Sequence, residues 1–262
     1  MATTGNNGSL WNSIKNNIKG VGDYFWIKLN NTNVRCRIAG RNIYKYCDGL
    51  MLLTTNQYVI VTDTPFQTAK MNSANTTGVS SNNSSSKAAF LGSDMWNLTL
   101  GANTSTGNAV TTTGINNTLY SIFGSSLIKY MDLNTNAVDT SVPPSGNPIC
   151  NTAAKGMGCS SDWGFYECYA TLLNECELYG GPIFSSSGYD IGLKKAQLPL
   201  FSLNPKLIIL KNDQDTEDSR QWYWLKNVAS GTRFCVCGYF GGASVADATS
   251  SYNIRLEFLL SA

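Results

Sequence analysis

The chain has 262 residues, enough for one large domain or two small ones, and 14% of them are charged, with a formal net charge of +2. This weak charge, without a basic stripe, argues against nucleic acid as a partner and against an anionic membrane surface. The sequence has no histidine, which removes the commonest general base and metal ligand and every Ser-His or Cys-His nucleophile arrangement.

The first expected element is a helix over residues 9–18, because Trp11, Ile14 and Ile18 fall on one helical face and Ser9 is a suitable N-cap. A second apolar stripe predicts a helix over residues 117–128. Residues 166–179 read as a helix or as a helix–strand junction. Alternating or short apolar runs predict strands at 24–29, 34–38, 207–210, 222–226, 232–237 and 254–260, and a hairpin joining 50–54 to 58–62.

Polar stretches rich in Asn, Ser, Thr and Gly, at residues 71–87 and 103–117, predict long surface loops. Short strands, two or three helices and long loops indicate an α+β fold rather than a doubly wound sheet. We expect one domain over residues 1–262. It would hold an N-terminal helix and strands (1–70), a loop-rich and helical middle (71–212) and a C-terminal region (213–262).

No apolar run is long enough to span a bilayer, and residues 1–5 lack the basic and apolar blocks of a secretory signal. We therefore expect synthesis and folding in a cytosol, where cysteines stay reduced. The eight cysteines form no Cys-x-x-Cys pair, which argues against zinc ribbons and thioredoxin-type sites, and we expect most of them to be buried thiols. They are Cys36, Cys47, Cys150, Cys159, Cys168, Cys176, Cys235 and Cys237.

An acidic run at residues 213–218 lacks the glycine and closing glutamate of a calcium-binding loop, so we interpret it as a solvated loop. Two tryptophans further along, Trp222 and Trp224, would point to the same face of a strand. We expect Trp224 in the core and leave Trp222 open between the core and a binding surface. The sequence thus predicts no catalytic residue, no metal site and no cofactor.

The most informative segment is 222–260, in which strand-like ends frame small, aromatic and aliphatic residues without a helical or strand period. Residues 227–253 contain no Lys, Glu, Gln, Met or Trp, and 228–252 contain no Asn. None of those five types can be reached from an asparagine codon by changing its adenines alone. The gap therefore fits adenine-specific mutagenesis of an asparagine-rich template. The positions without an obvious fold requirement are Val236, Gly238, Tyr239, Phe240, Gly242, Ser244, Val245, Ala246, Asp247, Ser250 and Tyr252.

Seven short motifs in order resemble an uncharacterised domain frequent in gut bacteria and their phages. They are Met71-Asn72, Gly92-Ser93-Asp94-Met95, Ile122-Phe123-Gly124, Leu172-Leu173-Asn174-Glu175 with Tyr179-Gly180, Gln197-Leu198-Pro199-Leu200-Phe201, Tyr223-Trp224-Leu225-Lys226 and Ile254-Arg255-Leu256-Glu257-Phe258. Family members usually have Arg at the position of Lys226, and Gly-Val-Arg-Pro where this chain has Asn253-Ile254-Arg255-Leu256. Many members are variable proteins of diversity-generating retroelements.

The resemblance implies a C-type-lectin-like fold in its formylglycine-generating-enzyme-like form. In such proteins a rigid scaffold holds variable side chains that face solvent in one ligand-binding patch. Here the eleven positions above would vary, with Tyr239, Phe240 and Tyr252 as energetic anchors, Asp247 adding polar specificity and Arg233 flanking the patch.

The function implied is a non-enzymatic phage virion protein, at a tail tip or on the capsid exterior. It would bind a host or gut-surface protein or glycan and contact other virion proteins. A homotrimer is expected, since repetition of weak sites increases avidity. The alternatives are a bacterial surface adhesin with the same domain and an enzyme of the formylglycine-generating type. The enzyme would use a metal and a cysteine pair, for which Cys235 and Cys237 are the candidates.

Overall fold

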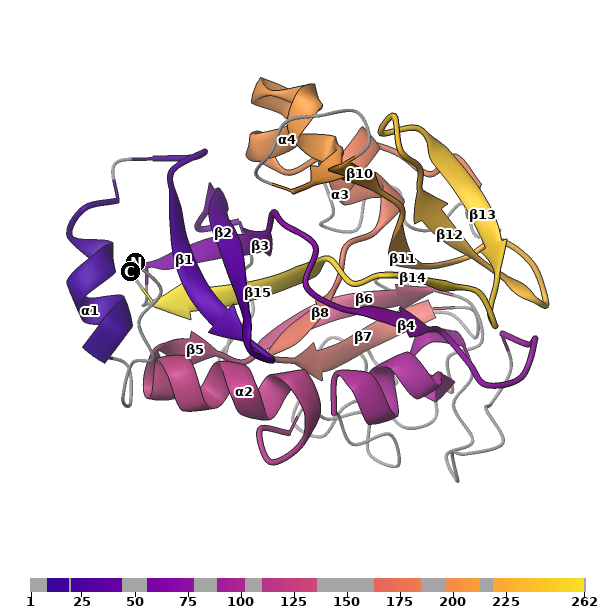
Figure 1. Ribbon diagram of the computed structural model, residues 1–262, viewed down its shortest axis with the longest axis horizontal. Helices are drawn as coiled ribbons and strands as arrows, with labels where there is room; N and C mark the ends of the chain where they lie inside the picture. Colours follow the sequence, from indigo (N-terminus) through magenta and orange to yellow (C-terminus); the bar gives the residue numbers. More distant parts are fainter. Residues whose placement is uncertain are drawn as a thin grey trace, which may run out of the picture.

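The computed structural model describes residues 9–18, 20–43, 56–77, 89–101, 110–135, 163–184, 197–212 and 219–261. Most of its elements are strands, with a few short helices, which confirms the α+β expectation (Figure 1). Two sheets dominate, one antiparallel and one with a single parallel pair, and there are also two small sheets of two strands each. In the described residues no helix is long and apolar enough to cross a membrane.

The first sheet has the order β1-β2-β3-β15-β5, and β8 also pairs with β15. A two-residue turn at Asn30 and Asn31, both at positive φ, joins β1 to β2, as is common in tight hairpins. Strands β3 and β15 are buried along almost their whole length and form the centre of this sheet. The bounds are β1 Tyr24–Leu29, β2 Thr32–Arg41, β3 Gln57–Thr62, β5 Leu127–Ile128, β8 Ala170–Leu172 and β15 Leu256–Ser261.

The second sheet has the order β13-β12-β11-β14-β4, with β14 parallel to β11. It contains most of the C-terminal segment that the sequence singles out. The smaller sheets pair β9 with β10 and β6 with β7. The bounds are β4 Thr68–Lys70, β6 Tyr130–Thr135, β7 Trp163–Cys168, β9 Leu210–Lys211, β10 Arg220–Gln221, β11 Tyr223–Val228, β12 Arg233–Cys237, β13 Ala243–Asp247 and β14 Ser251–Asn253.

The helices are short and cover the sheets. Helix α2 buries one stripe that includes Ile115, Leu119 and Phe123. In α3 a capping box, in which the side chains of Asn174 and Glu177 bond each other's backbone N–H, fixes the N-terminus. The helical bounds are α1 Ser9–Lys15, α2 Gly114–Phe123, α3 Glu175–Tyr179, α4 Pro199–Leu203, η1 Ala89–Gly92, η2 Met95–Thr99, η3 Gly124–Ser126 and η6 Pro205–Ile208.

The ends of the described chain meet in the core. Trp11 of α1 is fully buried, its indole N–H donates to the carbonyl of Ser261 at the end of β15, and its ring contacts Phe25, Tyr58 and Phe123. Figure 1 accordingly shows α1 beside the end of β15. Strand β15 therefore lies in the interior of the first sheet, between β3 and β5, and its end contacts α1.

The expected strands at 24–29, 34–38, 222–226, 232–237 and 254–260 lie within or overlap β1, β2, β11, β12 and β15, and residues 166–179 are a strand–helix junction as expected. The helix expected at 117–128 instead spans Gly114–Phe123, since Gly124 takes a positive φ and residues 127–128 pair with β15. The strand expected at 207–210 is wrong for residues 207 and 208, which belong to the helical turn η6 that Pro205 opens, and Leu210 lies in β9. The first arm of the expected hairpin, 50–54, and the acidic run 213–218 lie outside the described residues.

Candidate functional site

The C-terminal segment folds into a β12–β13 hairpin whose tip carries two aromatic rings. The backbone N–H of Gly238 donates to the carbonyl of Gly242, and that of Gly241 donates to Gly238, each over 2.9 Å. Gly241 has a φ of 80°, the left-handed conformation that a three-residue hairpin loop requires at its third position. The loop backbone is thus closed by its own hydrogen bonds, and Tyr239 and Phe240 at its apex are 48% and 78% exposed.

Trp222 and Tyr252 continue the aromatic surface away from this loop. The Trp222 ring stacks on Tyr252 at 5.7 Å and 27°, and meets the edge of Tyr239 at 5.4 Å and 82°. The Arg220 guanidinium lies over the Phe240 ring, 5.5 Å from its centroid. We call the four rings Trp222, Tyr239, Phe240 and Tyr252 the aromatic tip.

The two tryptophans of this segment have different environments. Trp224 is fully buried, contacts Phe234 and Tyr252, and donates from its indole N–H to the carbonyl of Ala69 over 2.8 Å. The expectation that Trp224 belongs to the core is therefore confirmed. Trp222, which the sequence leaves open, is half-buried: it packs against the core and also contacts the exposed Tyr239 ring.

The register of the sheet divides the predicted site residues between its two faces. Val236 lies opposite Trp224 on one side and Ser244 on the other, whereas Cys235 lies opposite Val245. Because neighbouring residues of a strand point to opposite faces, Ser244 and Ala246 face one side, and Val245 and Asp247 the other. The expectation of a single patch is therefore wrong for β13.

Three of the predicted positions do not face solvent. Val236 is fully buried, Ala246 is 7% exposed, and Ala246 lies opposite the buried Phe234 in the register. Gly238 is also buried, and a Cβ added there would lie 3.3 Å from the Trp222 ring. Val236 and Ala246 are part of the core, and Gly238 lies against the Trp222 ring, so we correct their assignment from ligand contact to support.

The polar members lie at the other end of the same hairpin. Arg233 and Asp247 form a cross-strand ion pair at 2.9 Å, with side chains 54% and 46% exposed. Ser250 follows in a turn closed by its N–H donating to the carbonyl of Asp247 over 2.8 Å. Four residue steps separate Arg233 from Cys237, or about 13 Å along the strand. The ion pair therefore forms a separate polar end, not a flank of the aromatic tip.

Gly242 is exposed, and a Cβ added there would meet no atom within 4 Å. Ser244 and Val245 are half-buried on the edge strand β13. Among the predicted positions, Tyr239, Phe240 and Gly242 thus form a contiguous, exposed group at the end of the hairpin.

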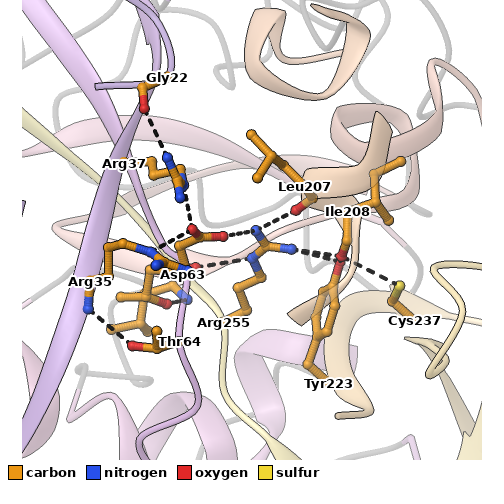
Figure 2. Close-up of polar contacts among 12 residues, drawn as sticks. Gly22, Arg35, Arg37, Asp63, Thr64, Leu207, Ile208, Tyr223, Cys237 and Arg255 are labelled. Carbon is orange, nitrogen blue, oxygen red and sulfur yellow. Dashed lines mark hydrogen bonds and ion pairs between the residues drawn. The ribbon is translucent and has the colours of Figure 1, made fainter. Parts of the chain in front are cut away.

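Beneath the hairpin, a buried polar network fixes the chain where it passes between the two sheets (Figure 2). Arg255 lies between β14 and β15 and is fully buried. Its guanidinium donates from Nε to the carbonyl of Thr62 (3.0 Å), from Nη1 to Ile208 O (2.8 Å) and Tyr223 Oη (3.2 Å), and from Nη2 to Leu207 O (2.8 Å) and Asp63 Oδ1 (3.2 Å). All five guanidinium N–H groups are therefore satisfied, which is the condition under which a buried arginine is tolerated.

Asp63 is the anionic centre of this network. It follows β3, and its carboxylate also accepts hydrogen bonds from the Nε atoms of Arg35 (2.9 Å) and Arg37. Figure 2 shows the three guanidiniums arranged around this one carboxylate. The arrangement ties β2, the end of β3 and the start of β15 to the base of the aromatic hairpin.

The cysteines of β12 are inaccessible. Cys235 and Cys237 are buried thiols, as are Cys36, Cys168 and Cys176. The expectation of buried thiols is thus confirmed for these five, and the other three cysteines lie outside the described residues. Burial raises the pKa of Cys237 above its ordinary value of 9.0, and the hydroxyls of Tyr179 and Tyr223 and the charge of Arg255 only partly oppose this. Within the described part of the chain no three His, Cys, Asp or Glu side chains form a metal-binding group.

Sequence reasoning missed Arg220, Asp63 and the buried role of Arg255. Arg255 stands in one of the motifs, but its burial depends on contacts with segments about 50 and about 190 residues away, which no local pattern reveals.

Comparisons with protein-family models, with curated proteins and with solved structures find no match for the chain.

Proposed function

We propose that the protein binds a ligand at the surface of a phage virion, and that the aromatic tip is the contact surface. The observation that carries this proposal is the exposure of Tyr239 and Phe240 at the apex of a hairpin closed by its own backbone hydrogen bonds. Large, rigid rings supply contact area at a low cost in conformational entropy, so an exposed pair of them is suited to binding.

The packed core and the buried hydrogen bonds below the aromatic tip support the same proposal. Trp224, Phe234 and Val236 fill the core under the hairpin, and Arg255 fixes the neighbouring chain crossing. A loop whose backbone is held by the scaffold can exchange its exposed side chains without loss of fold. We therefore propose that diversification acts on Tyr239, Phe240 and Gly242 and on exposed neighbours, and not on the buried positions 236, 238 and 246.

The ordered motifs of the sequence extend this proposal to family and fold. On their basis we propose a variable protein of a diversity-generating retroelement, with a C-type-lectin-like fold in its formylglycine-generating-enzyme-like form. The ligand would be a host or gut-surface protein or glycan. The protein would form a trimer on a tail tip or the capsid exterior, where repetition raises avidity. Neighbouring DNA should encode a reverse transcriptase and an adenine-rich near-copy of codons 227–253, and a genome without both would remove the diversification claim.

Binding is proposed rather than catalysis. A formylglycine-generating type of enzyme needs accessible cysteines, whereas Cys235 and Cys237 are fully buried. A raised pKa keeps the Cys237 thiol protonated at neutral pH, which disfavours nucleophilic or metal-binding use.

The proposal is tested by binding of the fluorescently labelled protein to gut-bacterial cells and to immobilised mucin. We expect Tyr239→Ala with Phe240→Ala to abolish binding while the melting temperature changes little. The matched control is Arg233→Ala with Asp247→Ala, which alters the polar end of the same hairpin. Retained binding in the first variant and loss in the second would place the site at the polar end and refute the aromatic tip.

A further inference from the structure

The outer edge of strand β13 is a second feature of the C-terminal hairpin. Strand β13 comes last in the order β13-β12-β11-β14-β4, and Figure 1 shows it at the outer side of the second sheet. Its five residues, Ala243–Asp247, pair with β12 in a continuous register without a bulge. No strand of the described residues pairs with its other side. Residues 243–245 are only half-buried, so this edge of the sheet is partly open to solvent.

Two hydrogen bonds at the ends of the hairpin show which backbone groups of β13 point outward. The N–H of Gly238 donates to the carbonyl of Gly242, and the N–H of Ala248 donates to the carbonyl of Thr232, each over 2.9 Å. Opposite residues in an antiparallel ladder are hydrogen-bonded at every second position. The even-numbered residues of β13 therefore bond to β12, and the odd-numbered residues direct their N–H and C=O groups away from it.

The odd-numbered residues Ala243 and Val245 present donors and acceptors at a regular spacing. No hydrogen bond that involves the described residues uses their backbone groups. At Asp247 the carbonyl accepts from the N–H of Ser250, so the row of outward groups closes there. Outward pairs two residues apart, at roughly 7 Å, match the backbone repeat of another extended strand.

The other edge strands of the two large sheets differ from β13. Strand β1 carries Lys28, β4 has three residues and ends at Lys70, and β5 and β8 have two and three residues. Lysine and short length are two ways in which proteins keep an edge strand from pairing with another chain. Residues 243–247 contain neither lysine nor proline, and the central Val245 is β-branched. Of these edges, β13 is therefore the one suited to accept an added strand.

The open edge is continuous with the aromatic tip. The loop 238–242, which carries the exposed rings, joins β12 directly to β13. Ser244 lies opposite Val236, which lies opposite Trp224. Ser244 and Trp224 therefore share a sheet face, on which Trp224 contacts Tyr252 of the aromatic tip. A strand added about 5 Å outside β13 would project every second side chain to that face.

We propose that β13 takes part in ligand binding by strand addition. An extended polypeptide segment of the ligand pairs with the outer edge of β13, and the aromatic tip contacts its side chains. This inference rests on the proposed function and narrows the ligand to a protein, because a glycan lacks the row of amide donors and acceptors that matches this edge. Main-chain hydrogen bonds add affinity whatever the ligand sequence, whereas side-chain contacts supply specificity. Each such bond has a small net effect, so the edge and the rings have to act together.

Hydrogen exchange of the full-length protein tests the edge itself. The N–H of Val245 should exchange rapidly and that of Ala246 slowly, because only the second is bonded to β12. Protection of Val245 in the free protein would contradict the proposal. If that protection increases with protein concentration, the edge pairs with a second copy of the chain instead of a ligand.

The probes for strand addition are short peptides selected on the full-length protein from a random phage-displayed library. We expect the selected peptides to protect the N–H groups of Ala243 and Val245 from exchange. N-methylation of alternate peptide residues should abolish binding in one alternation and leave it intact in the other, since only one set of N–H groups faces β13. A selection without binders, peptides that leave Val245 unprotected, or tolerance of methylation at every position would overturn the proposal.

A proline substitution tests the edge from the side of the protein. Val245→Pro removes an outward N–H and no bond to β12, so the variant should fold and bind the selected peptides about tenfold more weakly. The matched control is Lys28→Pro on edge strand β1. Its N–H also points outward, because the adjacent pair Leu29↔Thr32 closes the β1–β2 hairpin. Lys28→Pro should leave the affinity unchanged, and equal losses in both variants would refute a specific site at β13.

Two further comparisons separate this inference from the proposed function. If Tyr239→Ala with Phe240→Ala still allows peptides to protect Val245, the edge binds as proposed and the role of the aromatic tip is wrong. If that variant loses peptide binding while Val245→Pro binds like the wild type, the tip is the site and strand addition is wrong. In the cell-binding assay, protease treatment of the cells should abolish binding. Loss after periodate oxidation but not after protease would make the ligand a glycan and contradict strand addition.

Discussion

Arg255 donates to Asp63 over 3.2 Å at the place where two segments of the chain cross between the first and the second sheet. Asp63 follows β3 and precedes β4, and Arg255 lies between β14 and β15. Since β3 pairs with β15 and β4 pairs with β14, both crossings run side by side in opposite directions. This ion pair therefore links the two connections between the sheet that carries the aromatic tip and the first sheet.

Removing Arg255 should strongly destabilise the fold. Arg255→Met leaves the Asp63 carboxylate with two of its three guanidiniums and leaves the carbonyls of Thr62, Leu207 and Ile208 without this donor. We expect a loss of about 3–5 kcal/mol in the free energy of unfolding, measured by urea denaturation. Arg233→Met, which breaks an exposed ion pair, should cost only about 0–1 kcal/mol. Equal losses in the two variants would contradict the structural role of Arg255.

The two glycines at the end of the hairpin loop should respond differently to substitution. Gly241→Ala puts a Cβ at a positive φ and 3.2 Å from Ile209, so we expect a loss of about 1–2 kcal/mol. Gly242→Ala enters open space and should change stability by less than about 0.5 kcal/mol. Thermal denaturation of both variants checks this. Equal tolerance at both positions would argue against the loop conformation described here.

Tyr252 and Tyr239 should differ in their contribution to stability. Tyr252 contacts the buried Trp224 at 5.1 Å as well as Trp222, whereas Tyr239 contacts only the edge of Trp222 among the described rings. Tyr252→Ala should therefore cost about 2 kcal/mol, and Tyr239→Ala less than about 1 kcal/mol, in chemical denaturation. If Tyr239 proves the more costly of the two, the outer part of the tip supports the fold rather than a ligand.

Stability should fall in alkaline solution. Burial raises the pKa values of Cys36 and Cys237 above 9.0 and those of Tyr179 and Tyr223 above 10.0. The unfolded chain releases these protons at the ordinary values while the folded protein retains them. The free energy of unfolding is therefore at its full value below pH 9.0 and decreases above it, by about 1.4 kcal/mol per pH unit for each group that ionises only on unfolding.

Denaturant titrations between about pH 8 and about pH 10.5 would measure this decrease. Cys237→Ala removes one of the four groups and should make the decline shallower by the share of that group. A free energy of unfolding that stays constant or rises over this range would show that these side chains are accessible to hydroxide.

The sequence predicted most of the strands that alternate or are uniformly apolar. Residues 24–29 are mostly aromatic and aliphatic, as is typical of a strand, and the structure places β1 at these bounds. Edge strand β13 was missed because Ala243–Asp247 contains small residues without an inward apolar set. The ends of α2 were misplaced since the conformation of Gly124, and not the apolar pattern, decides where that helix stops.

For the candidate site, composition singled out the segment that carries the exposed rings but did not indicate its register. The exposed rings of Tyr239 and Phe240 agree with the expectation that they face solvent. Val236 and Ala246 are similar small apolar residues in sequence, and only the fold shows that they are buried. Likewise, Arg233 and Asp247 are close to the aromatic residues along the chain, yet strand length separates them in space.

The central claim is that the fold does not depend on the side chains of Tyr239 and Phe240. The most direct measurement is a display library that randomises residues 239, 240 and 242, scored for protease resistance beside a matched library at residues 236, 238 and 246. We predict that most members of the first library stay folded and that most of the second unfold. Equal losses in both libraries would contradict the claim, because the rings would then be part of the core.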